Sequence, residues 1–191
     1  MTIPATSSNK QQLRGEIRQL LRGAPRESEG VREALRRWLA ARPALRTVAL
    51  FAALPGEIDL LPLLASAPDR RWLFPRVCGE DLIFCQVRDP ACDLQPGSLG
   101  IREPSPALPG VPLSEIDVFL CPGLAFDPLG GRLGRGRGYY DRALAASRPD
   151  ALKLGICHPC QLVADTFPQA HDVIMDGVIS GADTPTTGKL T

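Results

Sequence analysis

The sequence predicts an α/β domain whose mainly parallel sheet is covered by helices on both faces. Short apolar runs of strand length alternate with segments in which apolar residues recur every three or four positions, as on an amphipathic helix. Runs that are apolar nearly throughout suit parallel strands buried on both faces. With 191 residues, of which 44% are hydrophobic, the chain can bury one sizeable core. We therefore expect one domain over residues 1–181, followed by a polar and mobile tail over 182–191.

The first predicted element is a helix capped by Ser7 or Ser8 and running to about Leu21. Lys10 falls within its apolar stripe and Arg14 falls beside it. A lysine on an apolar face usually extends its ammonium group to solvent, which is one interpretation. The alternative is that this helix packs beside a cleft and directs both cations into it.

Later elements follow from apolar period and turn residues. Pro55-Gly56 ends the first strand, and Cys78-Gly79-Glu80 joins two strands in a tight turn. In chain order we expect a helix over 28–41, a strand over 47–54, a short helix from Asp59 as cap through about Ala65, strands over 71–77 and 81–87, an irregular connection over 88–115, a strand over 117–121, a helix over 139–146, and strands over 151–157 and 173–180.

Residues 121–142 are the most informative stretch for function, because five glycines interleave with three arginines between Gly130 and Gly138. Glycine permits positive φ and lets backbone N–H groups approach a ligand, and the arginine fork matches phosphate oxygens. The segment follows a predicted strand, and ligands of open parallel sheets bind beyond the carboxyl ends of strands. A helix that begins near Gly138 directs its positive dipole end to the same space. The pattern indicates a cradle for a polyphosphate, formed by Gly130, Gly131, Arg132, Gly134, Arg135, Gly136, Arg137 and Gly138 and closed by Tyr139, Tyr140 and Asp141.

Known phosphate-binding motifs do not describe this segment. No Gly-Lys-Ser/Thr follows the glycines, which excludes a Walker A loop, and the glycine spacing differs from that of the dinucleotide fingerprint. Two alternatives stay open: an ordinary surface loop, or an Arg-Gly segment for single-stranded nucleic acid. The second lacks support elsewhere, since aromatic residues make up only 5% of the chain.

Several acidic residues are candidates for ligand contacts. Asp141 follows the tyrosines directly and could hold Mg²⁺ beside bound phosphates, or could only stabilise the first turn of its helix. Asp172 or Asp176 could supply a second carboxylate, and both could equally be loop residues. Glu57 follows the end of a strand, where binding residues collect, although a solvated turn acid is the alternative.

Composition excludes several classes of protein. The net charge is +1, which argues against a field that attracts nucleic acid or a membrane surface. No apolar stretch approaches the roughly 20 residues of a membrane span, and no secretory leader is evident. Six cysteines show no disulfide scaffold, and the single pair Cys157 and Cys160 offers too few ligands for structural zinc. We expect a cytoplasmic protein, with neither nucleic acid nor a membrane as partner, that is a monomer.

The run from Pro122 to Asp141 resembles the signature of the 5-formyltetrahydrofolate cyclo-ligase family, also called methenyltetrahydrofolate synthetases. Weaker similarities come in the family's order: Lys10-x-x-x-Arg14, Phe51 to Glu57, Gly100-Ile-Arg-Glu-Pro104, and Gln161 through His171-Asp172. The resemblance implies a single three-layer α/β/α domain with a mainly parallel, Rossmann-like sheet. It implies a cytoplasmic enzyme whose partners are ATP and 5-formyltetrahydrofolate and whose cofactor is Mg²⁺.

The resemblance also assigns site residues. ATP would contact Lys10, Arg14, Arg132, Leu133, Gly134, Arg135, Gly136, Arg137, Gly138, Tyr139 and Tyr140. Folate would contact Ala52, Glu57, Arg135, Gly136, Arg137, Gly138 and Tyr139. Arg135 and Tyr140 would be catalytic, and Asp141 and Asp172 would match the metal positions, with Asp176 less favoured. Position 137 is commonly lysine or glycine in the family, so Arg137 is a departure that excludes proton transfer there. Ala52 is smaller than in many relatives.

The implied reaction makes 5,10-methenyltetrahydrofolate, ADP and phosphate through a phosphorylated formyl intermediate that N10 closes. Such chemistry needs alignment and charge stabilisation more than a protein nucleophile, which suits a segment of arginine and glycine. Two other interpretations remain: a nucleotide- or RNA-binding regulator without catalysis, and a kinase acting on a small molecule.

Overall fold

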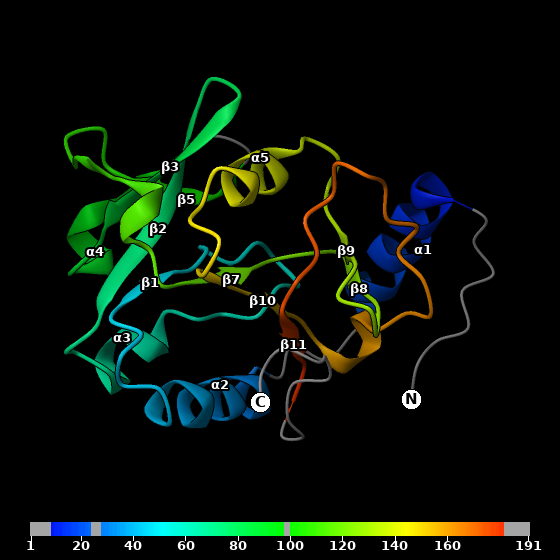
Figure 1. Ribbon diagram of the computed structural model, residues 1–191, viewed down its shortest axis with the longest axis horizontal. Helices are drawn as coiled ribbons and strands as arrows, with labels where there is room; N and C mark the ends of the chain where they lie inside the picture. Colours follow the sequence, from blue (N-terminus) through cyan, green and yellow to red (C-terminus); the bar gives the residue numbers. More distant parts are fainter. Residues whose placement is uncertain (1–8, 24–27, 98–99, 182–191) are drawn as a thin grey trace.

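The computed structural model describes residues 9–23, 28–97 and 100–181, and a seven-stranded sheet lies at its centre (Figure 1). The strand order is β11-β10-β7-β1-β2-β3-β6. The five strands from β11 to β2 run parallel, whereas β3 and β6 are antiparallel to their neighbours. The predicted mainly parallel α/β sheet is thus confirmed. The strands are β1 (Thr47–Ala49), β2 (Arg71–Cys78), β3 (Asp81–Gln86), β6 (Gly110–Val111), β7 (Val118–Cys121), β10 (Leu152–Ile156) and β11 (Gly177–Ile179).

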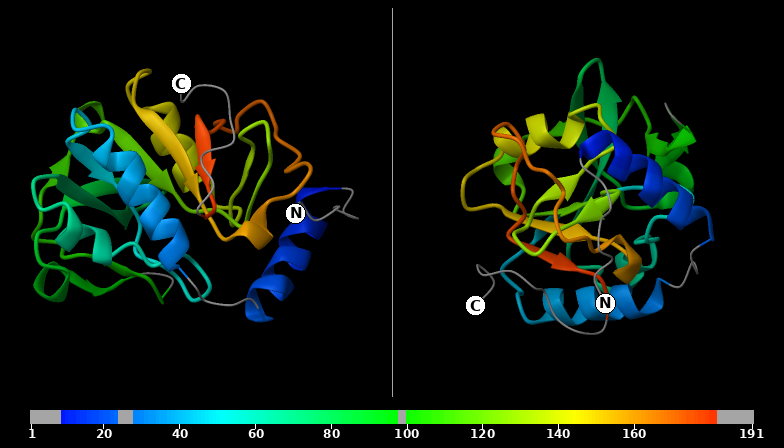
Figure 2. Two further views of the ribbon diagram at one scale, coloured as in Figure 1. Left: turned by 90° about the horizontal axis from the view of Figure 1, so that it is seen from below. Right: turned by 90° about the vertical axis from the view of Figure 1, so that its right-hand side faces the viewer.

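Helices cover both faces of this sheet, and alternate strand residues explain why. Helices α2 (Glu29–Ala40) and α3 (Pro62–Ser66) lie on one face, and α5 (Tyr139–Ala145) lies on the other (Figures 1 and 2). Val48 belongs to the apolar cluster that contains Leu35 of α2, whereas its neighbour Ala49 belongs to the cluster that contains Leu144 of α5. Successive strand side chains point to opposite faces, so a strand that is apolar throughout supplies both cores.

Helix α1 (Lys10–Gly23) packs away from this two-sided core, against the ribbon formed by β8 (Ala125–Phe126) and β9 (Arg132–Leu133) (Figure 1). Leu13 and Ile17 are its buried residues there. The helix begins after Asn9, whose Oδ1 accepts hydrogen bonds from the N–H groups of Gln11 and Gln12 at 3.0 Å each. Asn9 is therefore a cap that the sequence prediction missed, and Ser7 and Ser8 lie outside the described residues.

The predicted strand over 47–54 was too long, since β1 ends at Ala49. The N–H of Leu50 still donates to the carbonyl of Leu73 at 2.8 Å, after which the chain leaves the sheet. Residues 50–52 are nevertheless buried, because they close the core and form a wall beyond the strand end. Apolar character there reports burial and not strand pairing. Asp59 is not the cap of α3 either: its Oδ1 accepts from the N–H of Leu61 before the helix starts.

The connection over 88–115 is more ordered than predicted. It contains elements of only two to four residues, a length that leaves little periodic pattern in the sequence. These are α4 (Pro90–Asp93), β4 (Leu94–Pro96), β5 (Arg102–Pro104), β6 and the 3-10 turn η2 (Leu113–Glu115). A second 3-10 turn, η3 (Pro159–Gln161), follows β10. The hairpin of β2 and β3, the helices over 29–40 and 139–145, and the late strands follow the sequence prediction with shifted ends. The single-domain interpretation stays a prediction, and residues 182–191 lie outside the described ones.

Candidate active site

A cavity of about 1120 Å³ opens at the carboxyl ends of β1, β2 and β7. Its wall contains Phe51 and Ala52 after β1, Val77 near the end of β2, and Pro122 and Gly123 after β7. Parallel strands end at one edge of the sheet, so residues that follow different strands meet there. The cavity is where the sequence analysis expected a ligand site.

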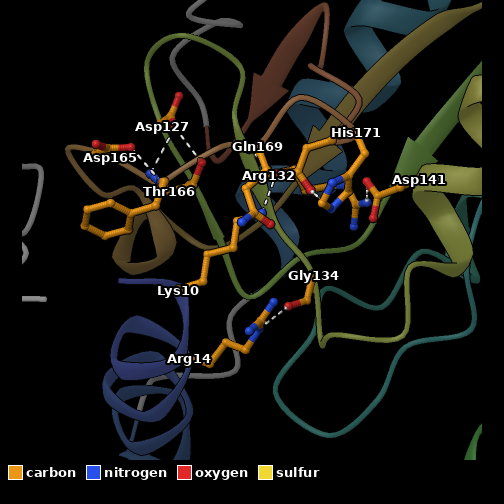
Figure 3. A network of polar contacts seen from close by, with 12 residues as sticks. Lys10, Arg14, Asp127, Arg132, Gly134, Asp141, Asp165, Thr166, Gln169 and His171 are labelled. Atoms are coloured by element: carbon orange, nitrogen blue, oxygen red, sulfur yellow. Dashed lines mark hydrogen bonds and ion pairs between the residues drawn. The ribbon is translucent and has the colours of Figure 1, made fainter. Parts of the chain in front are cut away.

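The glycine and arginine segment, residues 130–138, borders this cavity and follows a turn that is held by a buried carboxylate. Asp127 accepts hydrogen bonds from the N–H groups of Leu129 and Gly131, at 2.9 Å each, through Oδ1. Its Oδ2 accepts from the N–H and the hydroxyl of Thr166 at 3.0 and 2.6 Å (Figure 3). A Cβ on Gly131 would lie 2.1 Å from Oδ2, so the turn has room only for glycine.

Arg14 reaches the segment from helix α1. Its Nε donates to the carbonyl of Gly134 at 3.0 Å, as Figure 3 shows. Gly136 follows with φ of +103°, a conformation that disfavours other residues. A Cβ there would lie 3.8 Å from the Arg14 guanidinium carbon. The chain thus folds closely around a cation that comes from the far end of the sequence.

Three cations of the cavity form ion pairs with three of the acids singled out in the sequence. Lys10 contacts Asp172. Arg132 Nη2 lies 2.7 Å from Asp141 Oδ1, and Arg135 Nη2 lies 2.7 Å from Glu57 Oε1. Each pair joins residues from different parts of the chain and places one positive and one negative group on the cavity wall. The wall can therefore receive an anion or, through the carboxylates, a cation held by that anion.

Arg132 and Tyr140 each hold a polar atom without a partner. The Arg132 Nε and the Tyr140 Oη are buried and make no hydrogen bond to another described residue, although both side chains line the cavity. The guanidinium carbon of Arg132 lies 5.5 Å from the centre of the Tyr140 ring. Burial raises the pKa of Tyr140 well above its ordinary value, so the phenol stays protonated and can donate. Two unused donors thus adjoin the cavity.

Asp172 is held as a carboxylate. Burial acts to raise its pKa, but hydrogen bonds from Lys10 and from the N–H of Gln169 outweigh burial and hold the pKa below its usual range. Asp176 is placed differently, because its Oδ2 accepts from the N–H of Lys153 and it does not line the cavity. Among the described ranges, no group of three or more histidine, cysteine or acidic side chains is arranged for a metal ion.

The remaining predicted contacts mostly border the same cavity. Ala52, Gly134, Gly136, Arg137, Gly138 and Tyr139 all line it. Leu133 does not, because its side chain is fully buried against Leu13 and Ile17 of α1. Cys157 and Cys160 are both free thiols, and neither lines the cavity.

Sequence reasoning missed several residues of this site. Glu103 on β5 is buried and lines the cavity. In the sequence, Gly100-Ile-Arg-Glu-Pro104 served only for the family resemblance, and Glu103 was not assigned to the site. Phe167 also lines it, at φ of +57°, the one positive value for a non-glycine residue among those the structure describes. Its N–H donates to Asp165 Oδ1 at 2.6 Å. Asp127 and Arg142 were also missed, because Thr166 and the tip of the β2–β3 hairpin become their neighbours only on folding.

Comparisons with known proteins agree along the chain. The family model of the 5-formyltetrahydrofolate cyclo-ligase family matches residues 6–181. The chain is 36% identical over 183 residues to a 5-formyltetrahydrofolate cyclo-ligase of Mycolicibacterium smegmatis. The aligned region covers 90% of this chain and 93% of that protein. It is 35% identical over 142 residues to the Escherichia coli K12 protein of the same name, which covers 70% and 77% of the two chains.

Solved structures show the same fold. The NMR structure of Aquifex aeolicus 5,10-methenyltetrahydrofolate synthetase superposes with a TM-score of 0.77 at 30% identity, over 93% of this chain and 92% of that one. A Mycoplasma pneumoniae 5,10-methenyltetrahydrofolate synthetase gives a TM-score of 0.74 at 23% identity, over 91% and 99% of the two chains, and so supports the fold alone. No helix in the described ranges combines the length and apolarity needed to span a bilayer.

Proposed function

The chain belongs to the 5-formyltetrahydrofolate cyclo-ligase family, and from this premise we propose how its cavity carries the reaction. Members are ATP-dependent ligases of one-carbon metabolism, and this chain is a cyclo-ligase that converts 5-formyltetrahydrofolate to 5,10-methenyltetrahydrofolate. We infer that ATP and the folate lie in the one cavity and react there directly. The observation that carries this proposal is that the cationic segment and an apolar wall with Glu57 border the same space.

ATP phosphates would lie along the cationic side of the cavity. Lys10 and Arg14 border it from α1, and Arg132, Arg135 and Arg137 border it from the segment. The unpartnered Arg132 Nε and Tyr140 Oη offer donors that a phosphate oxygen can satisfy. Backbone N–H groups of the turn add neutral donors. The proposed ATP contacts are Lys10, Arg14, Arg132, Gly134, Arg135, Gly136, Arg137, Gly138, Tyr139 and Tyr140, whereas Leu133 is left out because it does not line the cavity.

The folate would lie against the apolar wall. Phe51, Ala52, Val77 and Ile101 present carbon surface there, which suits a flat pterin ring. The Glu57 side chain is only 8% exposed and is oriented by the N–H of Leu54, which donates to its Oε2 at 3.0 Å. A carboxylate held in this way can accept hydrogen bonds from pterin N–H groups. Proposed folate contacts are Ala52, Glu57, Arg135, Gly136, Arg137, Gly138 and Tyr139.

The chemistry then belongs mainly to the two substrates. The formyl oxygen on N5 attacks the γ-phosphorus, and the bond to ADP breaks. N10 next attacks the formyl carbon and loses its proton, and phosphate leaves with the former formyl oxygen and takes up that proton as the methenyl bridge forms. Charge on the transferring phosphoryl group needs fixed donors, which arginines and a protonated tyrosine supply.

We assign Arg135 and Tyr140 the catalytic roles. Arg135 donates to Glu57 Oε1 through Nε at 3.2 Å and through Nη2 at 2.7 Å. Arg135 therefore links Glu57, the acid proposed to bind the folate, to the segment proposed to bind phosphate, and it can align the two substrates. Tyr140 keeps its proton because of burial, so it acts as a donor to developing negative charge and not as a base.

The residues present fit Mg²⁺ of the kind that bridges substrate phosphates. Mg²⁺ is commonly held by one or two carboxylates together with phosphate oxygens and water, without a cage made by protein alone. Asp141 and Asp172 both border the cavity, and the lowered pKa of Asp172 keeps it ionised. We propose these two as the metal carboxylates. When bound, Mg²⁺ would neutralise phosphate charge.

An absorbance assay tests the proposal. Purified protein should form the methenyl chromophore from 5-formyltetrahydrofolate only when ATP and Mg²⁺ are both present, with one ADP for each product. Omission of ATP, or its replacement by ADP, is the control. Absence of the chromophore under complete conditions would reject the assignment, and phosphate retained on an organic product would indicate a kinase.

Two variants locate the chemistry. Arg135→Ala and Tyr140→Phe should each lose most turnover while the thermal unfolding temperature stays near that of the parent, because Arg135 is 42% exposed and Tyr140 keeps its ring. Loss of one such donor typically costs about 100-fold or more in rate. Near-normal turnover in both variants would place the reaction elsewhere.

A further inference from the structure

Arg142 joins two structures that border the cavity from different parts of the chain. It lies on α5, and its guanidinium reaches the tip of the β2–β3 hairpin, where it donates to the carbonyl of Glu80. Its Nε lies 3.4 Å from Asp81 Oδ1 at the same tip. Its Nη1 donates to the carbonyl of Arg137, in the glycine and arginine segment, at 3.2 Å. One planar fork thus binds three acceptors at once.

The hairpin held in this way is a wall of the cavity. Val77 on β2 and Leu82 on β3, which flank the tip, both line it. A second contact joins the same parts, since Tyr139 Oη donates to the carbonyl of Gly79 at 3.5 Å. The Arg142 guanidinium carbon lies 5.5 Å from the centre of the Tyr139 ring. The position of the wall therefore depends on α5 and the segment that precedes it.

The contact with Arg137 also fixes the direction of a peptide group. The Arg137–Gly138 peptide is trans and planar, so a carbonyl that faces Arg142 turns the N–H of Gly138 the opposite way. This N–H makes no hydrogen bond to another residue of the described ranges, and Gly138 lines the cavity. Gly138 has φ of +69°, and a Cβ there would lie 2.9 Å from Arg142 Nη1. The backbone conformation thus favours glycine, and a Cβ would displace the guanidinium from its present position.

We propose that Arg142 is a positioning residue for the ligase reaction. It holds the Arg137–Gly138 peptide so that the N–H of Gly138 can donate to a phosphate oxygen. The same guanidinium keeps the hairpin wall against the segment, so the folate and ATP sides of the cavity are set together. This inference rests on the proposed function and deepens it, because Arg142 acts through Gly138 and the hairpin and not by touching the reacting atoms.

Arg148 is a matched control. It also links distant segments, by donating to the carbonyl of Ile116 at 3.0 Å and by forming ion pairs with Asp117 and Asp150. Its exposure is similar, 31% against 44% for Arg142. Asp117 precedes β7, so these contacts lie at the end of that strand opposite the cavity. Arg148→Ala should lower thermal stability and leave the kinetic constants unchanged.

The kinetic test compares Arg142→Ala, Arg142→Lys and Arg148→Ala. Loss of one fixed donor predicts a fall in kcat/KM of about 100-fold for Arg142→Ala. Arg142→Lys should recover only part of this, because an ammonium group cannot bind the three acceptors in one plane. Ethylguanidinium at sub-denaturing concentration should restore activity to Arg142→Ala. Unchanged kcat/KM, full activity of Arg142→Lys, or equal kinetic losses in Arg142→Ala and Arg148→Ala would each overturn the proposal.

A second measurement does not depend on turnover. Cys78 is exposed at the end of β2 and can carry a spin label in a background with Cys92→Ser and Cys160→Ser. The label should become more mobile in Arg142→Ala and unchanged in Arg148→Ala. If the parent protein lacks ligase activity, the proposed function fails, yet this mobility still decides whether Arg142 holds the hairpin. Equal mobility in the parent and in Arg142→Ala would overturn the inference.

Discussion

Removing the Asp141 carboxylate should destabilise the protein more than removing its partner, the Arg132 guanidinium. The Arg132 side chain is 3% exposed and that of Asp141 is 20% exposed. Besides Asp141, the guanidinium contacts the carbonyl of Pro122 at 3.4 Å, and its Nε has no hydrogen-bond partner in the part of the chain that the structure describes. The carboxylate, by contrast, keeps some water and lies in the first turn of α5, where negative charge is favourable. The two single variants therefore leave very different groups behind.

The magnitudes follow from what is left unpaired. Asp141→Asn leaves a buried cation, a loss of about 3 kcal/mol in the free energy of unfolding. Arg132→Met leaves a partly hydrated carboxylate and should cost about 1–2 kcal/mol. The double variant should cost clearly less than the sum of the single ones, since neither charge remains. For a protein of this size, about 3 kcal/mol corresponds to a fall of roughly 6–12 °C in Tm.

Urea denaturation and thermal unfolding of the four proteins measure this asymmetry without any activity assay. Tripolyphosphate without Mg²⁺ supplies a further test, because an anion can take the place of the missing carboxylate beside Arg132. At 100 times its Kd for Asp141→Asn it should stabilise this variant by about 2.7 kcal/mol, and at the same concentration it should stabilise the parent less. Losses that simply add, or a larger loss for Arg132→Met than for Asp141→Asn, would refute the reasoning.

Three further predictions concern the support of the site. Gly131→Ala should lower the free energy of unfolding in urea by about 3 kcal/mol, because its Cβ would lie 2.1 Å from Asp127 Oδ2. Gly30→Ala on α2, where a Cβ has open space, should instead raise it by about 0.5 kcal/mol, and equal effects of the two variants would contradict the geometry. Asp127→Asn should lower Tm by several degrees, because an amide cannot accept all four hydrogen bonds that the carboxylate receives from the turn and from Thr166, and an unchanged Tm would argue against that network. Burial lowers the pKa of His158, so the unfolded chain binds more protons, and stability should fall as pH drops from about 6.5 toward the folded pKa, by at most about 1.4 kcal/mol per pH unit. Thermal unfolding of the parent and of His158→Gln from pH 7.5 to 5.5 measures this contribution. If stability falls equally with pH in both proteins, the pH dependence does not come from His158.

Local patterns were sufficient for the fold class and for the place of the site. Periodicity located the helices over 29–40 and 139–145 and the strands of the central sheet other than β6, because burial on one or two faces gives each of these segments a characteristic apolar pattern. It failed where burial and strand pairing separate, as at residues 50–52, and in the connection that contains β4 and β5. The glycine spacing and the preceding strand were enough to predict that the segment over 121–142 borders a ligand cavity.

Sequence alone determined the chemical character of the site: arginines and glycines after a parallel strand, acids within reach, and a lysine and an arginine on the first helix. Only the tertiary structure decided the partners. It joined Lys10 with Asp172 and Arg135 with Glu57, removed Leu133 and Asp176 from the cavity wall, and revealed Asp127 and Arg142 as supports. The physical reason is that composition and period record how each segment is buried. Hydrogen bonds and ion pairs between distant segments exist only once the whole chain has brought their atoms within about 3 Å.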